Sequence, residues 1–374
     1  MIRVEKIHLC EIQLPLKEPF RISSGEVSMR RVLIVKLIDG DGTVGWGESV
    51  AGEQPYYSPE TIEGVWIAIR NFIGPRVLGR TFEHPRDVFP ALSEDIRGNN
   101  MAKAAIEMAS WELAASKQSA SLADLLGGSR SRIATGISIG IQQSPAMLVE
   151  KARASAAAGY QKIKIKIKPG ADVDYVRSVR DALGPDVPLM VDANNAYSLD
   201  DIEHLQQLDD FDLMMIEQPL QWDDIVRHAT LQAAMRTPIC LDESITGPDR
   251  AEDMISLGAG RIINIKPGRV GGLTPAMAIH DICERHGIPV WCGGMLESGI
   301  GRAHNVALAS LSNFSLPGDV SPSSRYWERD IVAPEWTMDS DGFVTVPRNK
   351  SGMGVDIDRD WIDELTVRSE TFGL

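Results

Sequence analysis

The sequence predicts an α/β protein built on a (β/α)8 barrel, a modified TIM barrel, with an α+β capping domain. Three observations support this fold. Short apolar runs recur about every 25 residues from residue 133 onward, helical patterns separate them, and the earlier part of the chain shows hairpins and helices without that period. We therefore expect residues 1–127 to form the N-terminal part of the capping domain, 128–320 to form the barrel, and 321–374 to return to the capping domain.

The N-terminal part predicts an antiparallel sheet followed by helices. Apolar and polar residues alternate over 4–14 and 31–37, and a return strand is expected at 44–48 after a turn rich in Asp and Gly. Apolar residues then recur at helical spacing over 58–73 and 100–117. Strands followed by helices in this order are typical of an α+β unit.

Apolar runs predict the eight strands of the barrel. They lie at residues 136–140, 162–167, 188–193, 213–219, 238–242, 262–266, 289–292 and 314–316. Between two of them, Ser198 is expected to be the N-cap of a helix, with Asp201 at its third position. The alternative is a doubly wound open sheet, which needs a Gly-rich turn after its first strand. The partial GxGxxG match that starts at Gly299 comes late and lacks the third glycine.

Composition narrows the classes of partner. The formal net charge is -14 and the pI is about 5.0, so we expect neither nucleic acid nor an anionic membrane surface as partner, because the long-range field repels phosphate. Four cysteines are widely spaced without a CxxC motif, which is typical of a reduced cytoplasm: Cys10, Cys240, Cys283 and Cys292. The chain shows no signal-peptide pattern at its start and no run of about 18 uncharged apolar residues. These features predict a cytoplasmic protein.

Carboxylates end three consecutive predicted strands. Asp192, Glu217 and Asp242 each follow an apolar run, roughly one strand-helix repeat apart. Neighbouring strands of a barrel lie about 4.8 Å apart, so we expect these side chains to converge. Three like charges that close repel one another unless a cation holds them, and oxygen ligands favour Mg²⁺. The sequence thus predicts a Mg²⁺ site in preference to three unrelated strand or helix caps.

Lysines alternate along the second predicted strand, and one lysine ends the sixth. From Lys162 to Lys168, period-two alternation places every lysine on one face. Strands inside a parallel barrel are normally apolar, so a lysine face turned inward needs a reason. We expect Lys164 and Lys166 to point at the carboxylates and Lys266 to face Lys166 across the barrel mouth. Two adjacent ammonium groups lower the pKa of one of them toward the range useful for a general base, so these lysines are the predicted acids and bases for moving a proton α to a carboxylate.

The sequence gives less support to other acid, base or nucleophilic residues. Six histidines fall on strand starts, helices or loops, and surface or core roles are expected for them: His8, His84, His204, His228, His280 and His286. His304 follows the Gly-rich turn after the seventh strand, from which the site is within reach. Cys292 ends a strand and is predicted to be a small core residue. A serine-hydrolase triad is not expected.

A KxK motif, then Asp, Glu and Asp on the next three strands, then a lysine on the sixth, resembles the enolase superfamily in its muconate lactonizing enzyme subgroup. The resemblance covers nearly the whole chain. Longer segments are similar to N-acylamino acid racemases that also carry o-succinylbenzoate synthase activity: GYQKIKIKIKPGADVD, PLMVDANNAYSL, IEQPL, TPICLDES, NIKPGRVGG and IPVWCGGMLESGIGRAHN. The resemblance therefore implies the barrel with its capping domain and an isomerase, a lyase or both.

The resemblance also implies a role for each matching position. Lys166 would be the principal acid/base, Lys164 its electrostatic partner, and Lys266 the acid/base of the opposite face. Asp192, Glu217 and Asp242 would ligate Mg²⁺, for which Mn²⁺ substitutes, and Asn194 and Glu243 would orient them. The substrate would contact Ser138, Gly294, Met295 and Leu296 in the barrel, and Phe20 and Tyr57 in capping loops 20–25 and 50–57.

The activity implied is Mg²⁺-dependent racemization of N-succinyl or other N-acyl amino acids by two-base proton transfer through an enediolate, with syn-dehydration to o-succinylbenzoate in the same site. This implies a small anionic carboxylate substrate, a link to menaquinone biosynthesis, and a homo-oligomer, either a dimer or an octamer. Cycloisomerases keep the same lysines and stay open as an alternative. Dipeptide epimerases present an acid pair where Asp319-Val320-Ser321 offers one acid, and mandelate racemases place a histidine where Lys266 stands. A binding barrel without activity would lack a ligand or a lysine, and all six are present.

Overall fold

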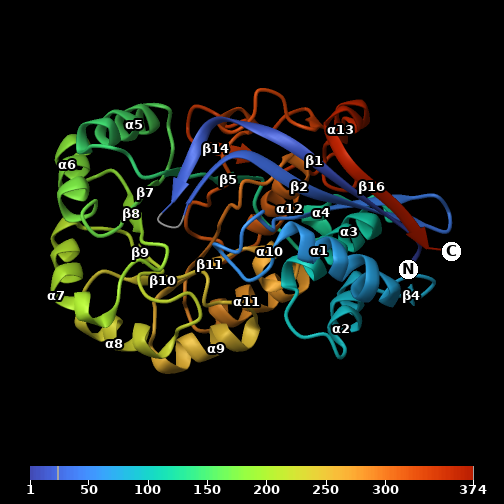
Figure 1. Ribbon diagram of the computed structural model, residues 1–374, viewed down its shortest axis with the longest axis horizontal. Helices are drawn as coiled ribbons and strands as arrows, with labels where there is room; N and C mark the ends of the chain where they lie inside the picture. The colour runs from blue at the N-terminus through green and yellow to red at the C-terminus, as the bar shows by residue number, and fades with distance from the viewer. Residues whose placement is uncertain (23–24, 374) are drawn as a thin grey trace.

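The computed structural model describes residues 1–22 and 25–373. Its capping domain contains an antiparallel sheet in the order β16-β1-β2-β3, and the short β4 pairs with the start of β1. The strands are β1 (Ile2–Ile22), β2 (Gly25–Asp39), β3 (Val44–Ser49), β4 (Thr81–Phe82) and β16 (Thr366–Gly373). β1 and β2 form a hairpin longer than predicted, which extends toward the barrel in Figure 1. The hairpin contacts the barrel where the Ile141 N–H donates to the Arg21 carbonyl at 3.1 Å.

Helices and single turns cover this sheet. They are α1 (Ile62–Ala68), a π turn (Ile69–Ile73), 3-10 turns (Gly74–Arg76 and Pro85–Asp87), α2 (Val88–Ser93), α3 (Asn100–Lys117) and α4 (Leu122–Leu126). A Cβ on Gly45 or Gly47 of β3 would lie 2.2 or 2.1 Å from a carbonyl oxygen of α3, so this close approach requires glycine. Because α3 also packs against α10 (Pro267–Val270) and α11 (Leu273–Arg285) of the barrel, every residue from Met101 to Ala115 is buried.

The barrel is confirmed, with each strand inside or beside its predicted run. Seven parallel strands follow the order β12-β11-β10-β9-β8-β7-β6. They are β6 (Ile137–Ile139), β7 (Ile163–Lys166), β8 (Leu189–Asp192), β9 (Ile216–Glu217), β10 (Ile239–Leu241), β11 (Ile262–Ile265) and β12 (Val290–Cys292). Residues 316–319 fill the eighth position: the Asp319 N–H donates to the Cys292 carbonyl at 2.8 Å, and the Gly136 N–H donates to the Gly318 carbonyl at 2.6 Å. These bonds close the barrel between β12 and β6.

An outer ring of helices surrounds the strands (Figure 1). It comprises α5 (Pro145–Ala157), α6 (Val173–Leu183), α7 (Ile202–Leu205), α8 (Val226–Ala234), α9 (Pro248–Leu257), α10 (Pro267–Val270), α11 (Leu273–Arg285) and α12 (Gly299–Ala309). The predicted capping box of Ser198 and Asp201 is confirmed. Its helix is irregular, because 3-10 turns (Leu199–Asp201 and Gln206–Phe211) flank a single α turn.

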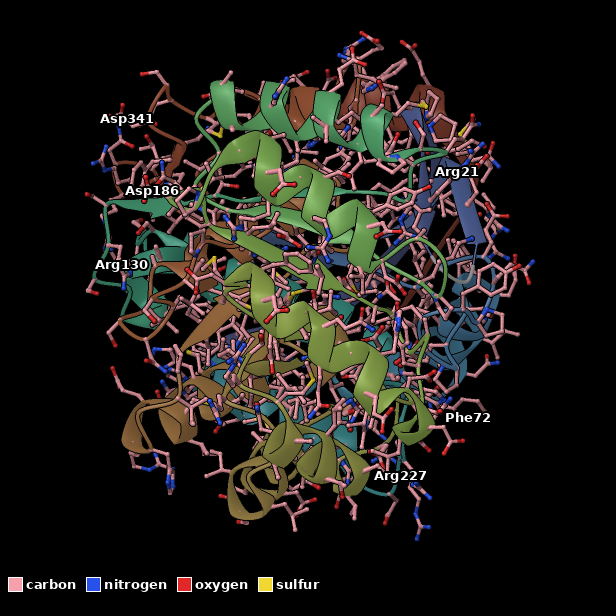
Figure 2. All side chains as sticks on the ribbon, turned by 90° about the vertical axis from the view of Figure 1, so that its left-hand side faces the viewer. Arg21, Phe72, Arg130, Asp186, Arg227 and Asp341 are labelled. Atoms are coloured by element: carbon pink, nitrogen blue, oxygen red, sulfur yellow. The ribbon has the colours of Figure 1, made fainter. Side chains whose placement is uncertain are left out.

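The two ends of the barrel are distinct. Figure 2 shows Arg21 at one edge of the molecule and Arg130, Asp186 and Asp341 at the opposite edge. Arg21 belongs to the β1-β2 hairpin, whereas Asp186 precedes β8, so the hairpin lies at the end where the strands finish. In TIM barrels the active site is found at this carboxyl end.

The C-terminal tail divides between the barrel and the capping domain. β16 pairs with β1, as a return to the capping domain requires. Another tail strand, β14 (Phe343–Thr345), instead pairs with β5 (Arg132–Ala134), which immediately precedes β6. The remaining elements are a 3-10 turn (Ser323–Arg325), β13 (Val332–Ala333), β15 (Asp356–Ile357) and α13 (Arg359–Leu365). The tail thus also covers the amino end of the barrel.

The four cysteines lie in the interior of the protein. All four cysteines are buried and free. Within the described residues, no helix combines the length and apolar character that crossing a membrane requires.

Candidate active site

Three acidic side chains lie at the carboxyl ends of adjacent strands. Asp192 ends β8, Glu217 ends β9, and Asp242 follows β10. Asp192 and Glu217 are direct partners in the parallel register, and Glu217 pairs with Cys240, two residues before Asp242. At most 1% of each acidic residue is exposed. Parallel register therefore brings the three predicted carboxylates into one layer of the barrel.

Two lysines of β7 reach this layer from one side. Lys166 Nζ donates to Asp192 Oδ2 at 2.5 Å and to Asn194 Oδ1 at 2.6 Å. Lys164 Nζ donates to Glu217 Oε2 at 3.1 Å and lies 3.4 Å from Asp192 Oδ2. The period-two alternation placed both lysines correctly on the inward face.

Lys266 follows β11 and approaches from the opposite side of the barrel. Its Nζ donates to Asp242 Oδ2 at 2.7 Å and to the Tyr57 hydroxyl at 3.2 Å. Asp242 Oδ1 accepts hydrogen bonds from the Tyr57 hydroxyl at 2.9 Å and from the Arg269 guanidinium. Arg269 lies in α10 and also donates to the Asn264 carbonyl at 2.6 Å. Sequence reasoning missed Arg269, although its place three residues after Lys266, within one helical turn, was a usable signal.

A second missed residue is the Asn264 side chain. It donates to Glu217 Oε1 at 2.6 Å from within β11. Asn264 lies two residues before Lys266, so the alternation that identified the β7 lysines applies here as well. Both oxygens of Glu217 are therefore engaged, one by an amide and one by Lys164.

Asp319 occupies the eighth strand position and joins the β7 lysines. Its Oδ2 lies 2.5 Å from Lys164 Nζ, and its Oδ1 lies 3.2 Å from Lys162 Nζ. Lys162 is fully buried, with Nζ 3.6 Å from the ring centroid of Trp291. From its sequence position, Asp319 was expected only to be a single acid after the last strand.

The buried charges shift one another's pKa values. Burial lowers the pKa of Lys164, but the carboxylates of Asp319, Glu217 and Asp192 outweigh it and raise that pKa well above the ordinary value. Burial also lowers the pKa of Lys266, but the carboxylate of Asp242 outweighs it, and the pKa of Lys266 is raised. Burial and the neighbouring Asp192 raise the pKa of Glu217. Lys164 is therefore not the lysine of the pair whose pKa is lowered, because the acids around it dominate.

Asn194 and Glu243 border the carboxylates. The Asn194 side-chain amide donates to Glu243 Oε1 at 3.2 Å, and its backbone N–H donates to Asp192 Oδ1 at 3.0 Å. Asn194, Gln218 and Leu296 have positive φ angles of 41°, 38° and 55°. Each lies just beyond the carboxyl end of a barrel strand. Left-handed backbone in residues with a Cβ is costly and concentrates at functional sites.

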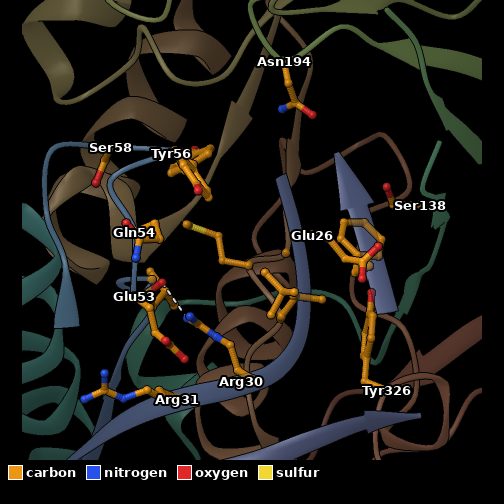
Figure 3. A pocket seen from close by; sticks show the side chains of 18 of the residues that line it. Glu26, Arg30, Arg31, Glu53, Gln54, Tyr56, Ser58, Ser138, Asn194 and Tyr326 are labelled. Carbon is orange, nitrogen blue, oxygen red and sulfur yellow. Dashed lines mark hydrogen bonds between the residues drawn. The ribbon is translucent and has the colours of Figure 1, made fainter. Parts of the chain in front are cut away.

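The lysines open into a cavity of about 460 Å³ between the barrel and the capping domain. Figure 3 shows Asn194 and Ser138 entering from barrel elements and Gln54, Tyr56 and Ser58 from a capping-domain loop. All six residues expected to contact substrate line it: Ser138, Gly294, Met295, Leu296, Phe20 and Tyr57. Residues 23 and 24 of the expected capping loop 20–25 lie outside the described residues.

Two other residues considered for the site, His304 and Cys292, lie outside the cavity. His304 bridges two helices, with Nδ1 3.0 Å from the Ile300 carbonyl oxygen and Nε2 3.2 Å from that of Met108. Burial lowers its pKa to about 4. Cys292 is buried as predicted, and burial raises the pKa of its thiol. Neither residue lines the cavity.

Three side chains on α11 are of the types that bind metals, but hydrogen bonds within the chain account for the histidine among them. His280, Asp281 and Glu284 lie close together, and the two acids are exposed. His280 Nε2 accepts a hydrogen bond from the Asn313 N–H at 2.9 Å, and His280 Nδ1 lies 2.9 Å from Asp281 Oδ1. Both ring nitrogens are therefore occupied within the chain.

The carboxylate layer fits a hard divalent cation. Its donors are carboxylate oxygens from three adjacent strands, which is the donor type that Mg²⁺ prefers. Burial and mutual repulsion raise the pKa of Glu217, so positive charge added here relieves a repulsion already present. Asp192, Glu217 and Asp242 are the residues that could hold such an ion.

A closed parallel barrel with carboxylates and facing lysines at its carboxyl end, covered by an antiparallel capping domain, defines an enolase-superfamily enzyme. Comparisons with known proteins agree. Residues 147–361 match the family model "Enolase C-terminal domain-like", and residues 5–127 match "Mandelate racemase / muconate lactonizing enzyme, N-terminal domain". The chain belongs to this family of the enolase superfamily.

Relatives named for two activities match along the full length. An o-succinylbenzoate synthase of Geobacillus kaustophilus is 49% identical over 99% of this chain and 98% of its own length. An N-succinylamino acid racemase of Thermus thermophilus is 43% identical over 98% of each chain. A solved enolase-superfamily structure from Listeria innocua superposes with a TM-score of 0.96 at 39% identity and covers 100% of both chains. Because the first relative is a lyase and the second an isomerase, the chain is an enzyme of one or both classes.

Proposed function

We propose that this enzyme racemizes N-succinyl and related N-acyl amino acids and also dehydrates a hydroxycyclohexadiene carboxylate to o-succinylbenzoate. One observation carries the proposal. Lys166 and Lys266 come from strands on opposite sides of a closed barrel and line one cavity. A substrate α-carbon between them has one lysine on each face.

In racemization the two lysines exchange roles. An uncharged Lys166 amine takes the α-proton, and the electron pair of the broken C–H bond moves into the carboxylate to form an enediolate. The Lys266 ammonium then donates a proton to the opposite face, and the C–H bond that forms has inverted configuration. Reaction of the other enantiomer runs these steps in reverse, so each lysine is acid in one direction and base in the other.

Positive charge stabilises the enediolate in the site. Asp192, Glu217 and Asp242 would hold Mg²⁺, which supplies positive charge to the substrate carboxylate. Lys164 lies 3.1 Å from Glu217 and 3.4 Å from Asp192, and it remains an ammonium because the carboxylates around it raise its pKa. A negative intermediate therefore forms beside fixed cations that are in place before the reaction.

Dehydration uses the same groups differently. In a syn-elimination the proton and the hydroxyl leave from one face of the ring, so Lys166 accepts the α-proton and then protonates the departing hydroxyl as water. Lys266 stays an ammonium beside the enediolate. One cavity with two lysines therefore supports both reactions without a further acid or base.

The cavity also suits an acylated amino group. Ser138 is buried, lines the cavity, and its hydroxyl has no hydrogen-bond partner among the described residues. An acyl or amide group placed there would satisfy it. A free substrate ammonium beside Ser138 would need a carboxylate, and the acid that the barrel contributes to the cavity lining, Asp319, is already ion-paired with a lysine at each oxygen. This favours N-acyl amino acids over dipeptides with a free amino group.

A cytoplasmic location, Mn²⁺ as a substitute metal, and an assembly of two or eight subunits belong to the same proposal. Sedimentation velocity of the purified chain measures the last of these.

Two assays test the proposal. N-succinyl-L-phenylalanine is incubated with enzyme and Mg²⁺, and its enantiomers are separated by chiral chromatography. In parallel, the hydroxycyclohexadiene carboxylate is followed by the ultraviolet absorbance of the benzoate product. Conversion to an equal mixture and formation of the benzoate are expected. If neither substrate reacts while a muconate is lactonized, the cycloisomerase alternative replaces this function.

A further inference from the structure

Lys162 is a buried cation that the proposed reaction does not use. It immediately precedes β7, and its side chain is 0% exposed. A Cβ on Gly136 would lie 2.6 Å from Lys162 Cε, so this glycine leaves the space that the lysine stem fills. On its other side Nζ lies 3.6 Å from the centroid of the Trp291 ring. Burying an ammonium is costly unless it is paired, so its retention in the core needs a reason.

Asp319 is the charge that pairs with it. Oδ1 of this carboxylate lies 3.2 Å from Lys162 Nζ, and Oδ2 lies 2.5 Å from Lys164 Nζ. Lys162 and Lys164 are two residues apart, so their side chains point to the same face of the chain at β7. Asp319 therefore bridges two neighbouring lysines on that face. Its backbone is fixed by the bond from its N–H to the Cys292 carbonyl at 2.8 Å.

Lys164 contacts three carboxylates. Its Nζ lies 2.5 Å from Asp319, 3.1 Å from Glu217 and 3.4 Å from Asp192. Lys166 comes next on that face and contacts the same Asp192 at 2.5 Å. A change at Asp319 therefore reaches Lys166 through one intervening lysine.

Lys266 is anchored by different groups. Its Nζ contacts Asp242 at 2.7 Å and Tyr57 at 3.2 Å. Among the described residues, the ion pairs of Asp319 are with Lys162 and Lys164 alone. The two faces of the substrate thus face separately supported lysines.

We propose that Asp319, neutralised by the buried Lys162, is a positioning residue that holds Lys164, and through it Lys166, in place for proton transfer on one face of the substrate. This rests on the proposed two-lysine function. Removing the carboxylate releases Lys164 toward Glu217 and Asp192 and disturbs Lys166 on one face of the substrate. Lys266, on the other face, keeps its contacts with Asp242 and Tyr57. The effect on proton transfer is therefore one-sided.

The test measures solvent exchange of the α-proton separately for each enantiomer. N-succinyl-L- and N-succinyl-D-phenylalanine are incubated with enzyme and Mg²⁺ in D2O, and loss of the α-proton signal is followed by NMR. The Lys266→Ala variant identifies the enantiomer served by Lys166, because only that enantiomer can then exchange. Asp319→Asn is expected to slow exchange of this enantiomer at least about tenfold, and exchange of the other less than about threefold.

Three further variants separate a positioning role from an effect on folding. Lys162→Met removes the buried charge and keeps the length of the side chain. It should slow α-proton exchange of the same enantiomer as Asp319→Asn does. If Lys162 acts through Asp319, the double variant Lys162→Met/Asp319→Asn is no slower than Asp319→Asn alone. Asp172→Asn is the matched control, because Asp172 is also a buried carboxylate, bound to Tyr197 and His204 outside the cavity. It should leave both exchange rates unchanged.

Equal slowing of both enantiomers in Asp319→Asn and Lys162→Met would overturn the inference, as would unchanged exchange in both variants. Wild-type enzyme that exchanges neither enantiomer contradicts the proposed function itself, and with it the inference. The two failures are therefore distinguishable in one set of spectra.

Discussion

Lys166 and Lys266 stand on opposite sides of the barrel, and each is bound to a different carboxylate, Asp192 at 2.5 Å and Asp242 at 2.7 Å. Strands β8, β9 and β10 lie between the strands that carry them. This arrangement separates the two lysines while both open into one cavity. In the proposed mechanism, this separation lets a proton leave one face of the substrate and return to the other.

Loss of either lysine should abolish racemization and dehydration. We expect Lys166→Ala and Lys266→Ala each to lower kcat for both reactions at least about a thousandfold, because racemization needs a group on each face and dehydration needs the base and the opposing ammonium. Steady-state kinetics with both substrates measure the effect. Lys168→Ala is the control, since Lys168 belongs to the same lysine run but is exposed. Near wild-type turnover in either active-site variant would rule out the mechanism.

Removing divalent metal should inactivate the enzyme. Dialysis against a chelator is expected to abolish both activities, and Mg²⁺ or Mn²⁺ should restore them, because Asp192, Glu217 and Asp242 would hold the ion that supports the enediolate. Asp242→Asn should weaken metal binding in calorimetry, whereas Asp281→Asn on α11 should not. Full activity of metal-free protein would remove the assignment of these carboxylates.

Acid should destabilise the fold through His304. Burial lowers its pKa to about 4, whereas an unfolded histidine titrates near about 6.5. Between these values the unfolded state binds more protons, so the free energy of unfolding falls as the pH drops through this window, by at most about 3 kcal/mol. Urea unfolding of wild type and His304→Gln at pH 7 and pH 4.5 checks it. An identical pH dependence in both proteins would contradict the prediction.

Glu107 should matter for joining the two domains. From α3 of the capping domain, it accepts hydrogen bonds from the Leu273 and Thr274 N–H groups at the start of α11, at 2.7 and 2.9 Å, and from Trp111 Nε1 at 2.8 Å. Glu107→Gln is expected to lower the free energy of unfolding by about 1 to 3 kcal/mol, because an amide cannot accept all of these bonds. Denaturant unfolding measures the change against the exposed Glu252→Gln. Equal stability of the two variants would show that the contact contributes little.

The strands and the acidic layer of the site could be predicted from the sequence because they follow periodic rules. Alternation along β7 identified Lys164 and Lys166, and strand ends in phase identified Asp192, Glu217 and Asp242. Such patterns depend on local geometry that every strand obeys.

Long-range contacts were not predictable in this way. Arg269 reaches Asp242 from α10, and its place one helical turn after Lys266 draws attention to the residue but does not specify that partner. The pairing of β14 with β5 joins segments about two hundred residues apart, and the pKa of Lys164 depends on acids from three other strands. These features follow only from the closed barrel.

The most direct test of the two-lysine account is proton NMR of N-succinyl-L-phenylalanine with wild-type enzyme and Mg²⁺ in D2O, recorded together with optical rotation. The account predicts that the α-proton signal and the rotation both disappear, and that the recovered material is an equal mixture of deuterated enantiomers. Exchange with full retention of rotation would contradict it, because a single lysine would then be acting on one face.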